Sequence, residues 1–156
     1  MPGLVFGEQV KGLRACYTSL VMARGFRFEF DPDNRILLLR FEDTRLTEES
    51  LTEIYTAMRQ YSTETNAYAG IADFSAVVQV DISEDFIRRL ASEEPAMPQA
   101  GKRGRIVVFS DEAGFAVARM FQSFGESTRP LFHVVRTLDE ALEAFGVESS
   151  RFEPLP

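Results

Sequence analysis

The chain has little of several residue types that carry enzyme chemistry or extracellular stability. It has one cysteine, one histidine and no tryptophan in 156 residues. The single cysteine, Cys16, excludes an internal disulfide and any metal site built from several thiolates, and it fits a reducing compartment. Any Ser-His-Asp triad or histidine-bound metal would have to use His133. Because His133 lies in a predicted strand, we expect an ordinary strand histidine, and we expect no metal and no cofactor.

Positive charge is also scarce. Lys and Arg number 17 against 24 Asp and Glu, for a formal net charge of −7. Nucleic acids and anionic membranes require a basic face, so we expect neither a nucleic acid nor a membrane as a partner. The one basic cluster, Lys102, Arg103 and Arg105, is too small for a nucleic-acid footprint. The mildly apolar stretch 15–23 is too short to span a bilayer and makes a poor secretory signal, so we expect a cytoplasmic location.

Common catalytic motifs are absent as well. The sequence contains no G-x-S-x-G, H-E-x-x-H or C-x-x-C pattern, and no phosphate-binding G-x-x-x-x-G-K-S/T loop. We therefore predict that the chain is not an enzyme.

What the chain does contain is the pattern of one α/β domain, since its length fits a single domain. Residues 1–24 show neither helical nor strand periodicity and are interrupted by glycines. We expect 1–24 to be an N-terminal appendage, either weakly ordered or the product of a misread start. The folded domain is predicted over 25–147, followed by a C-terminal tail at 148–156.

Five segments predict strands. Phe alternates with charged residues over 26–30, which is typical of a half-buried strand. The stretch 31–34, Asp-Pro-Asp-Asn, predicts a turn, because proline presets its φ and asparagine tolerates the left-handed conformation. The apolar run at 36–41 predicts a central strand covered on both faces. The other predicted strands are 69–74, 105–109 and 131–135.

Four segments predict helices, each with a polar residue that caps its start. These caps are Thr47, Ser83, Ser110 or Asp111, and Thr137. We expect Gly125 and Gly146 to end the last two helices, Gly125 in a left-handed conformation. In the third helix the predicted apolar stripe is Ala113, Val117, Met120, Phe121 and Phe124. The order β-β-α-β-α-β-α-β-α implies parallel crossovers after an opening hairpin, in a single mixed five-stranded sheet.

Several of these segments resemble one known family. They are IADFS at 71–75, RIVVF at 105–109, ARMF at 118–121 and VVRTLDEAL at 134–142. They are similar to the STAS family, named for sulphate transporters and anti-sigma-factor antagonists, and most of all to its SpoIIAA-like branch. The resemblance covers about residues 26–147. It implies a βα domain used for protein–protein regulation, with a protein partner and the option of a homodimer.

The resemblance also implies a modification site. In anti-sigma-factor antagonists of this family, a serine at a helix start is phosphorylated within the pattern Asp-Ser-Ser-Gly. The matching stretch here is Asp81-Ile82-Ser83-Glu84, which keeps Asp81 and Ser83. Ser83 is thus the candidate phosphoacceptor, with Asp81, Asp73 and Ser75 as further candidates for an interaction site. The simpler interpretation of Ser83 is a helix cap, and that of the two aspartates is turn chemistry rather than acid–base catalysis.

Three functions remain open on the sequence. The leading expectation is a non-catalytic regulatory or protein-interaction module of STAS type. Because the SpoIIAA-like branch is similar in shape to lipid-carrying domains, the first alternative is a carrier of a small apolar ligand or lipid. The second alternative is an enzyme of unknown class.

Overall fold

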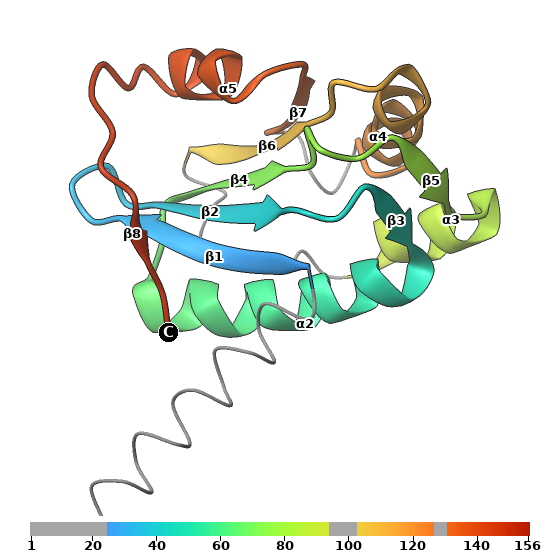
Figure 1. The fold of residues 1–156 in the computed structure, drawn as a ribbon, viewed down its shortest axis with the longest axis horizontal. Helices are drawn as coiled ribbons and strands as arrows, with labels where there is room; N and C mark the ends of the chain where they lie inside the picture. The colour runs from blue at the N-terminus through green and yellow to red at the C-terminus, as the bar shows by residue number, and fades with distance from the viewer. Residues whose placement is uncertain (1–24, 94–102, 127–130) are drawn as a thin grey trace, which may run out of the picture.

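The computed structural model describes residues 25–93, 103–126 and 131–156, so the predicted appendage at 1–24 lies outside the described residues. Over the described ranges the chain forms four helices and eight strands (Figure 1). In chain order they are β1 (Phe26–Asp31), β2 (Ile36–Phe41), β3 (Arg45–Thr47), α2 (Glu48–Thr65), β4 (Ala69–Asp73), β5 (Gln79–Asp81), α3 (Glu84–Ser92), β6 (Gly104–Val108), α4 (Glu112–Phe124), β7 (Phe132–Val135), α5 (Leu138–Ala144) and β8 (Glu153–Pro154).

The main sheet is mixed and has six strands in the order β7-β6-β4-β2-β1-β8. Strands β2, β4, β6 and β7 run parallel, whereas β1 is antiparallel to β2 and β8 is antiparallel to β1. All five predicted strands lie in this sheet, and the α/β class with a mixed sheet is confirmed. The predicted number of five is wrong, because Glu153–Pro154 from the expected tail adds a sixth strand beside Glu29 and Phe30 of β1.

The prediction of a single sheet is also wrong. Strands β3 and β5 pair in parallel and form a separate two-stranded sheet. Each has only three residues, which is too short for the alternation of buried and exposed positions that identifies a strand in a sequence. This small sheet lies beside α3 and the beginning of α2 (Figure 1), so it connects the carboxyl ends of β2 and β4 to two helix starts.

The opening hairpin is confirmed, with Asp31 of β1 opposite Ile36 of β2. The left-handed residue beside its turn is Arg35, with φ of 56°, and Asn34, whose residue type tolerates that conformation, does not adopt it. Asn34 instead donates a side-chain hydrogen bond to the Asp31 carboxylate at 2.7 Å. A positive φ is unfavourable for an arginine. The Arg35 guanidinium lies over the ring of Tyr68, 4.0 Å from the centroid, and this cation–π contact stabilises the conformation.

Each predicted helix cap is present, and Asp111 rather than Ser110 caps α4. The side chains of Thr47, Ser83, Asp111 and Thr137 each accept a backbone hydrogen bond from the first turn that follows. Gly146 ends α5 with φ of 71°, as a stop glycine should. The left-handed cap predicted at Gly125 is wrong. Its φ is −104°, because its N–H continues the helical pattern to the carbonyl of Phe121.

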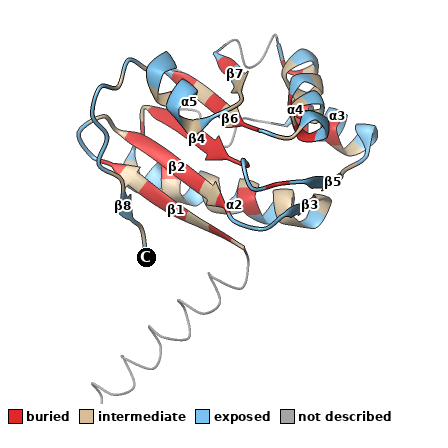
Figure 2. Cartoon of the chain, turned by 45° about the horizontal axis from the view of Figure 1, so that its top comes forward, coloured by how far each residue is buried: buried red, intermediate tan, exposed pale blue. Residues whose placement is uncertain are grey.

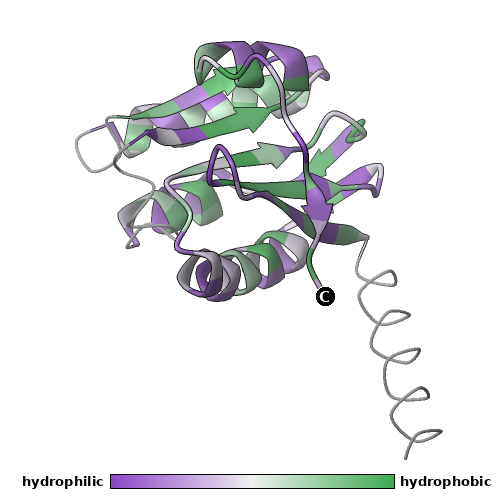
Figure 3. Ribbon diagram, turned by 90° about the vertical axis from the view of Figure 1, so that its left-hand side faces the viewer, coloured by the Kyte–Doolittle hydropathy of each residue, from purple (hydrophilic) through white to green (hydrophobic). Residues whose placement is uncertain are grey.

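The helices cover the two faces of the sheet unequally. Helices α2 and α4 pack on one face, where they bury the side of β2 that carries Leu37 and Leu39. On the other face α5 covers Ile36 and Leu38. Figure 1 places α2 and α5 on opposite sides of the sheet, Figure 2 shows the buried residues gathered in the central strands, and Figure 3 shows the same strands as hydrophobic. The continuous apolar run in β2 is thus explained by helices that cover both faces of this strand, as predicted.

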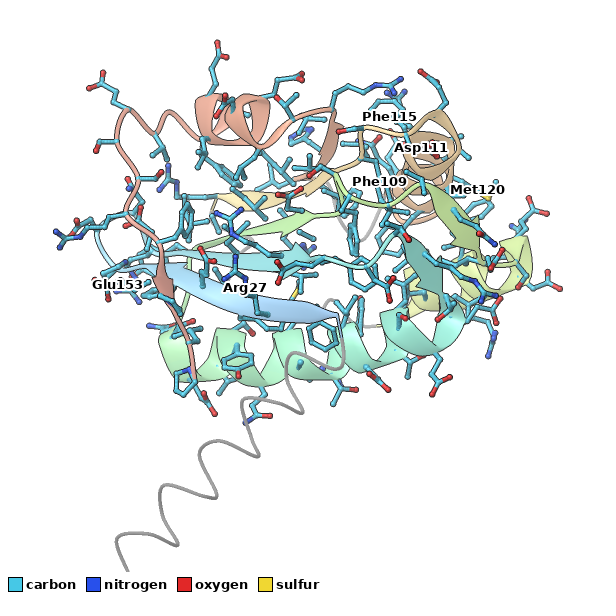
Figure 4. All side chains as sticks on the ribbon, viewed as in Figure 1. Arg27, Phe109, Asp111, Phe115, Met120 and Glu153 are labelled. Atoms are coloured by element: carbon cyan, nitrogen blue, oxygen red, sulfur yellow. The ribbon has the colours of Figure 1, made fainter. Side chains whose placement is uncertain are left out.

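Helix α4 approaches the sheet through small residues. Its buried positions are Gly114 and Ala118, whereas the predicted stripe began at Ala113, which is exposed. The stripe is rotated because the ring of Phe109 occupies the space beside Gly114, where a Cβ would lie 2.4 Å from the ring carbon Cδ1. Figure 4 shows Phe109 close to Asp111 at the junction of β6 and α4.

Candidate functional site

Ser83 lies at the start of α3 and is exposed. Its hydroxyl oxygen accepts a hydrogen bond from the N–H of Phe86 at 3.1 Å, so the capping role predicted for it is confirmed. Its own N–H donates to the carboxylate of Glu48, from the first turn of α2, at 2.8 Å. A phosphate on Ser83 would therefore meet Glu48 as well as the acidic residues Glu84 and Asp85 that follow.

Asp81 ends β5 and forms an exposed ion pair across the small sheet. The Nε of Arg45 in β3 donates to its Oδ2, and Gln79 donates to the same oxygen at 3.1 Å. The hydrogen bond from Arg45, with a smaller contribution from Gln79, lowers the pKa of Asp81 from its ordinary value of 3.8. Asp81 is thus held as a charged carboxylate, a state that suits an ion pair and not a general acid.

Asp73 ends β4 and is buried, next to the exposed Ser75. Its Oδ1 accepts a hydrogen bond from the backbone N–H of Ser75 at 3.0 Å, which is the turn chemistry predicted for it. Its Oδ2 lies 3.9 Å from Nη1 of Arg40 in β2. The structure therefore brings Asp73 and Ser75 together, while Asp73 and Asp81 belong to separate ion pairs on separate sheets.

The sequence did not indicate the charged network that holds Asp73. The carboxylate of Glu29 lies 2.9 Å from Nε of Arg40 and 3.4 Å from Nη2 of Arg27, and the Glu29 side chain is only 8% exposed. Arg27 also pairs with Glu42 at 3.2 Å. Arg27 lies on the sheet face opposite α2 (Figure 4), and the ion pairs of Arg27, Arg40 and Glu29 give Asp73 a structural role beside Arg40.

The feature best suited to binding is an apolar cavity. The sequence offered a carrier of an apolar ligand as an alternative but did not identify the residues of this site. The cavity has a volume of about 120 Å³ and lies between the sheet face of β4, β6 and β7 and the helices α2, α3 and α4. Its walls include Ile54 and Met58 of α2, Ile87 of α3, Ala118 and Phe121 of α4, and Phe109 after β6.

The cavity exists because small residues meet across this interface. Strand β4 presents Gly70 and Ala72 to the helices, and α4 presents Ala118. Larger side chains at these positions would fill the space, since protein interiors pack densely with few voids larger than a water molecule. A signal for the cavity was therefore present in the sequence, but it is spread over segments whose proximity only the fold reveals.

Two further features bear on the kind of site. Among the described residues, no group of three or more His, Cys, Asp or Glu could hold a metal ion. Within the same ranges, no helix combines the length and apolar character needed to cross a membrane.

No family model matches the chain, and no curated protein matches it.

Proposed function

We propose that this chain is a non-catalytic binding module that holds a small apolar ligand in the cavity between the sheet and helices α2, α3 and α4. The observation that carries the proposal is the cavity itself, about 120 Å³ with almost entirely apolar walls. An engineered apolar cavity of about 150 Å³ in another protein stays dry and binds benzene, so this space suits a group of roughly that size.

The lining selects against polar ligands. Among the described residues that line it, Tyr55 of α2 and Arg105 of β6 are the two with polar side chains. Burial of a polar group without a hydrogen-bond partner costs roughly 1–3 kcal/mol, whereas burial of apolar surface contributes about 25 cal/mol per Å². A hydrocarbon or aromatic group is therefore the ligand class that this space favours.

A non-catalytic role agrees with the state of the candidate residues. The Ser83 hydroxyl caps a helix, and Asp73 and Asp81 are each engaged by an arginine and by a neighbouring turn or strand residue. None of these interactions poises a nucleophile or a general base beside an adjacent partner.

The test is to fill the cavity. Ala118→Leu adds bulk inside it, and Ala116→Leu places the same side chain on the exposed side of α4 as a matched control. We expect benzene to shift the methyl NMR signals of Ile54, Met58 and Ile87 in the wild type and in Ala116→Leu. In Ala118→Leu the shifts should be lost while the protein stays folded. Equal benzene shifts in both variants, or none in the wild type, would contradict the proposal.

A protein-interaction role of STAS type is the second candidate, and the exposed Val78 is the position at which it is tested. This side chain, in the loop between β4 and β5, is 68% exposed. Its backbone N–H donates to the carbonyl of Thr44 at 2.8 Å. We expect a protein recovered from lysate with the wild type to be lost with Val78→Lys and to respond to Ser83→Asp. Recovery of the same proteins by all three baits would rule against this role.

A further inference from the structure

A second hollow lies between α2 and α3. It is a groove of about 310 Å³, much more polar than the cavity. Its described lining residues are Thr52, Tyr55, Thr56 and Arg59 of α2, Phe86, Arg89 and Leu90 of α3, and Glu93, which follows α3.

The groove and the apolar cavity share part of their walls. Tyr55 and Leu90 line both of them. The two hollows therefore adjoin at the side chains of Tyr55 and Leu90.

The groove carries two arginines without an opposing carboxylate in contact. Arg59 lies over the ring of Tyr55 at 6.0 Å, and Arg89 lies over the ring of Phe86 at 5.5 Å. Within the part of the chain that the structure describes, neither guanidinium forms a salt bridge, although the chain holds 24 acidic residues. Among the described lining residues Glu93 is the one acidic side chain, so this described lining keeps a net positive charge.

The other polar side chains of the groove have partners of their own. The hydroxyls of Thr52 and Thr56 donate to backbone carbonyls one turn earlier in α2. Glu48 lies near Arg89: hydrogen bonding from Ser83 lowers the pKa of Glu48, and the charge of Arg89 adds a smaller effect. Recognition of a ligand's polar end is thus left mainly to the two guanidinium groups.

We propose that the cavity and the groove form one site for a small anionic amphiphile, such as an aromatic or short-chain carboxylate. The apolar body occupies the cavity, and the carboxylate lies between Arg59 and Arg89 in the groove. Guanidinium groups suit this role because they bind carboxylates through paired, charge-assisted hydrogen bonds. This inference rests on the proposed function and adds the charge of the ligand to it.

The experiment compares three probes with the same apolar body: phenylbutanoate, phenylbutanol and phenylbutylammonium. Binding is measured by calorimetry at low ionic strength, where exposed charges are least screened. We expect the wild type to bind the carboxylate about tenfold more tightly than the alcohol, and the alcohol more tightly than the ammonium ion. Added salt should reduce the preference for the carboxylate.

The variants separate the two parts of the site. Arg59→Gln with Arg89→Gln should remove the preference for the carboxylate while the affinity for the alcohol, which also reports correct folding, stays unchanged. Arg88→Gln is the matched control, since Arg88 is the neighbouring arginine of α3, pairs with Glu84 and does not line the groove. It should retain the preference.

Two outcomes overturn the inference in distinguishable ways. Equal affinity of the wild type for the carboxylate and the alcohol, or equal effects of Arg88→Gln and the double variant, would refute the anionic site and leave the apolar cavity as a binding site. Failure of all three probes to bind the wild type would remove the proposed function together with the inference.

Discussion

The carboxylate of Glu48 accepts a hydrogen bond from the backbone N–H of Ser83, with the two atoms 2.8 Å apart. Glu48 is in the first turn of α2, and Ser83 caps α3, so this bond joins the starts of two helices that are distant in sequence. Hydrogen bonding from Ser83 lowers the pKa of Glu48 from its ordinary value of 4.5. One carboxylate thus serves the positive ends of two helix dipoles.

Glu48→Gln should make stability less dependent on pH. A carboxyl group whose folded-state pKa is lowered stabilises the fold fully above its unfolded pKa, and this contribution is lost as the pH falls through the folded value. We expect the variant to have a lower free energy of unfolding at neutral pH and to approach the wild type as the pH falls below 4.5. Urea denaturation over a pH series measures this, with Glu49→Gln as the control for first-turn charge. A difference that stays constant with pH would contradict the role of the bond.

Ser83→Ala should destabilise the protein by about 1 kcal/mol through loss of the α3 cap. Ser83→Asn should keep most of the stability, because the asparagine oxygen can accept the same hydrogen bond from Phe86. Thermal and urea unfolding give the comparison. Ser75→Ala is the control, since Ser75 is exposed and interacts with Asp73 through its backbone. Unchanged stability of Ser83→Ala would show that the cap contributes nothing.

Gly114→Ala should destabilise the protein although alanine favours helices. The new Cβ would lie 2.4 Å from the ring of Phe109, and overpacking of this kind costs about 1–3 kcal/mol. The gain in helix propensity is about 1 kcal/mol, which Ala116→Gly on the exposed side of α4 measures with opposite sign. Because Phe109 lines the cavity, a displaced ring should also weaken benzene binding. A stabilised Gly114→Ala protein would mean that Phe109 moves freely.

Asp31→Ala should cost roughly 2–4 kcal/mol, because the buried carboxylate connects the hairpin turn to the C-terminal segment. It accepts hydrogen bonds from the N–H groups of Asp33, Asn34 and Arg151 and from the Asn34 side chain.

The stability from Asp31 should also depend on pH. Burial raises the pKa of Asp31, but these hydrogen bonds together outweigh it and lower the pKa from its ordinary value of 3.8. The stabilisation should therefore be complete above that pH and be lost as the pH falls below it. Urea denaturation at neutral and acidic pH, with exposed Asp33→Ala as the control, measures both effects. A wild-type-like Asp31→Ala protein would refute this role.

Sequence patterns predicted the elements whose signals are local. The alternation over 26–30, the apolar run of β2 and the caps Thr47, Ser83 and Thr137 each depend on neighbouring residues, and the structure has each of them. The STAS resemblance and the roles inferred from it stay predictions, as does the cytoplasmic location.

The short strands, the buried ion pair and the cavity could not be predicted, because each depends on residues that are distant in the sequence. Strands β3, β5 and β8 have two or three residues each and are defined by their partners, not by a period. The ion pair of Glu29 with Arg40 depends on the register of β1 and β2. The cavity depends on small residues of β4 and α4 that meet only after folding.

The pairing of the strands also determines how the protein can fold. Among the described strands that pair in the main sheet, β1 and β2 alone are joined by a short turn, whereas each parallel pair from β2 to β7 is separated by a helix-containing crossover. Pairing two strands across a short loop loses less chain entropy than pairing strands across a long one. The hairpin is therefore the part of the sheet that can form earliest. During refolding, backbone amides of the hairpin should gain protection from hydrogen exchange before those of β6 and β7.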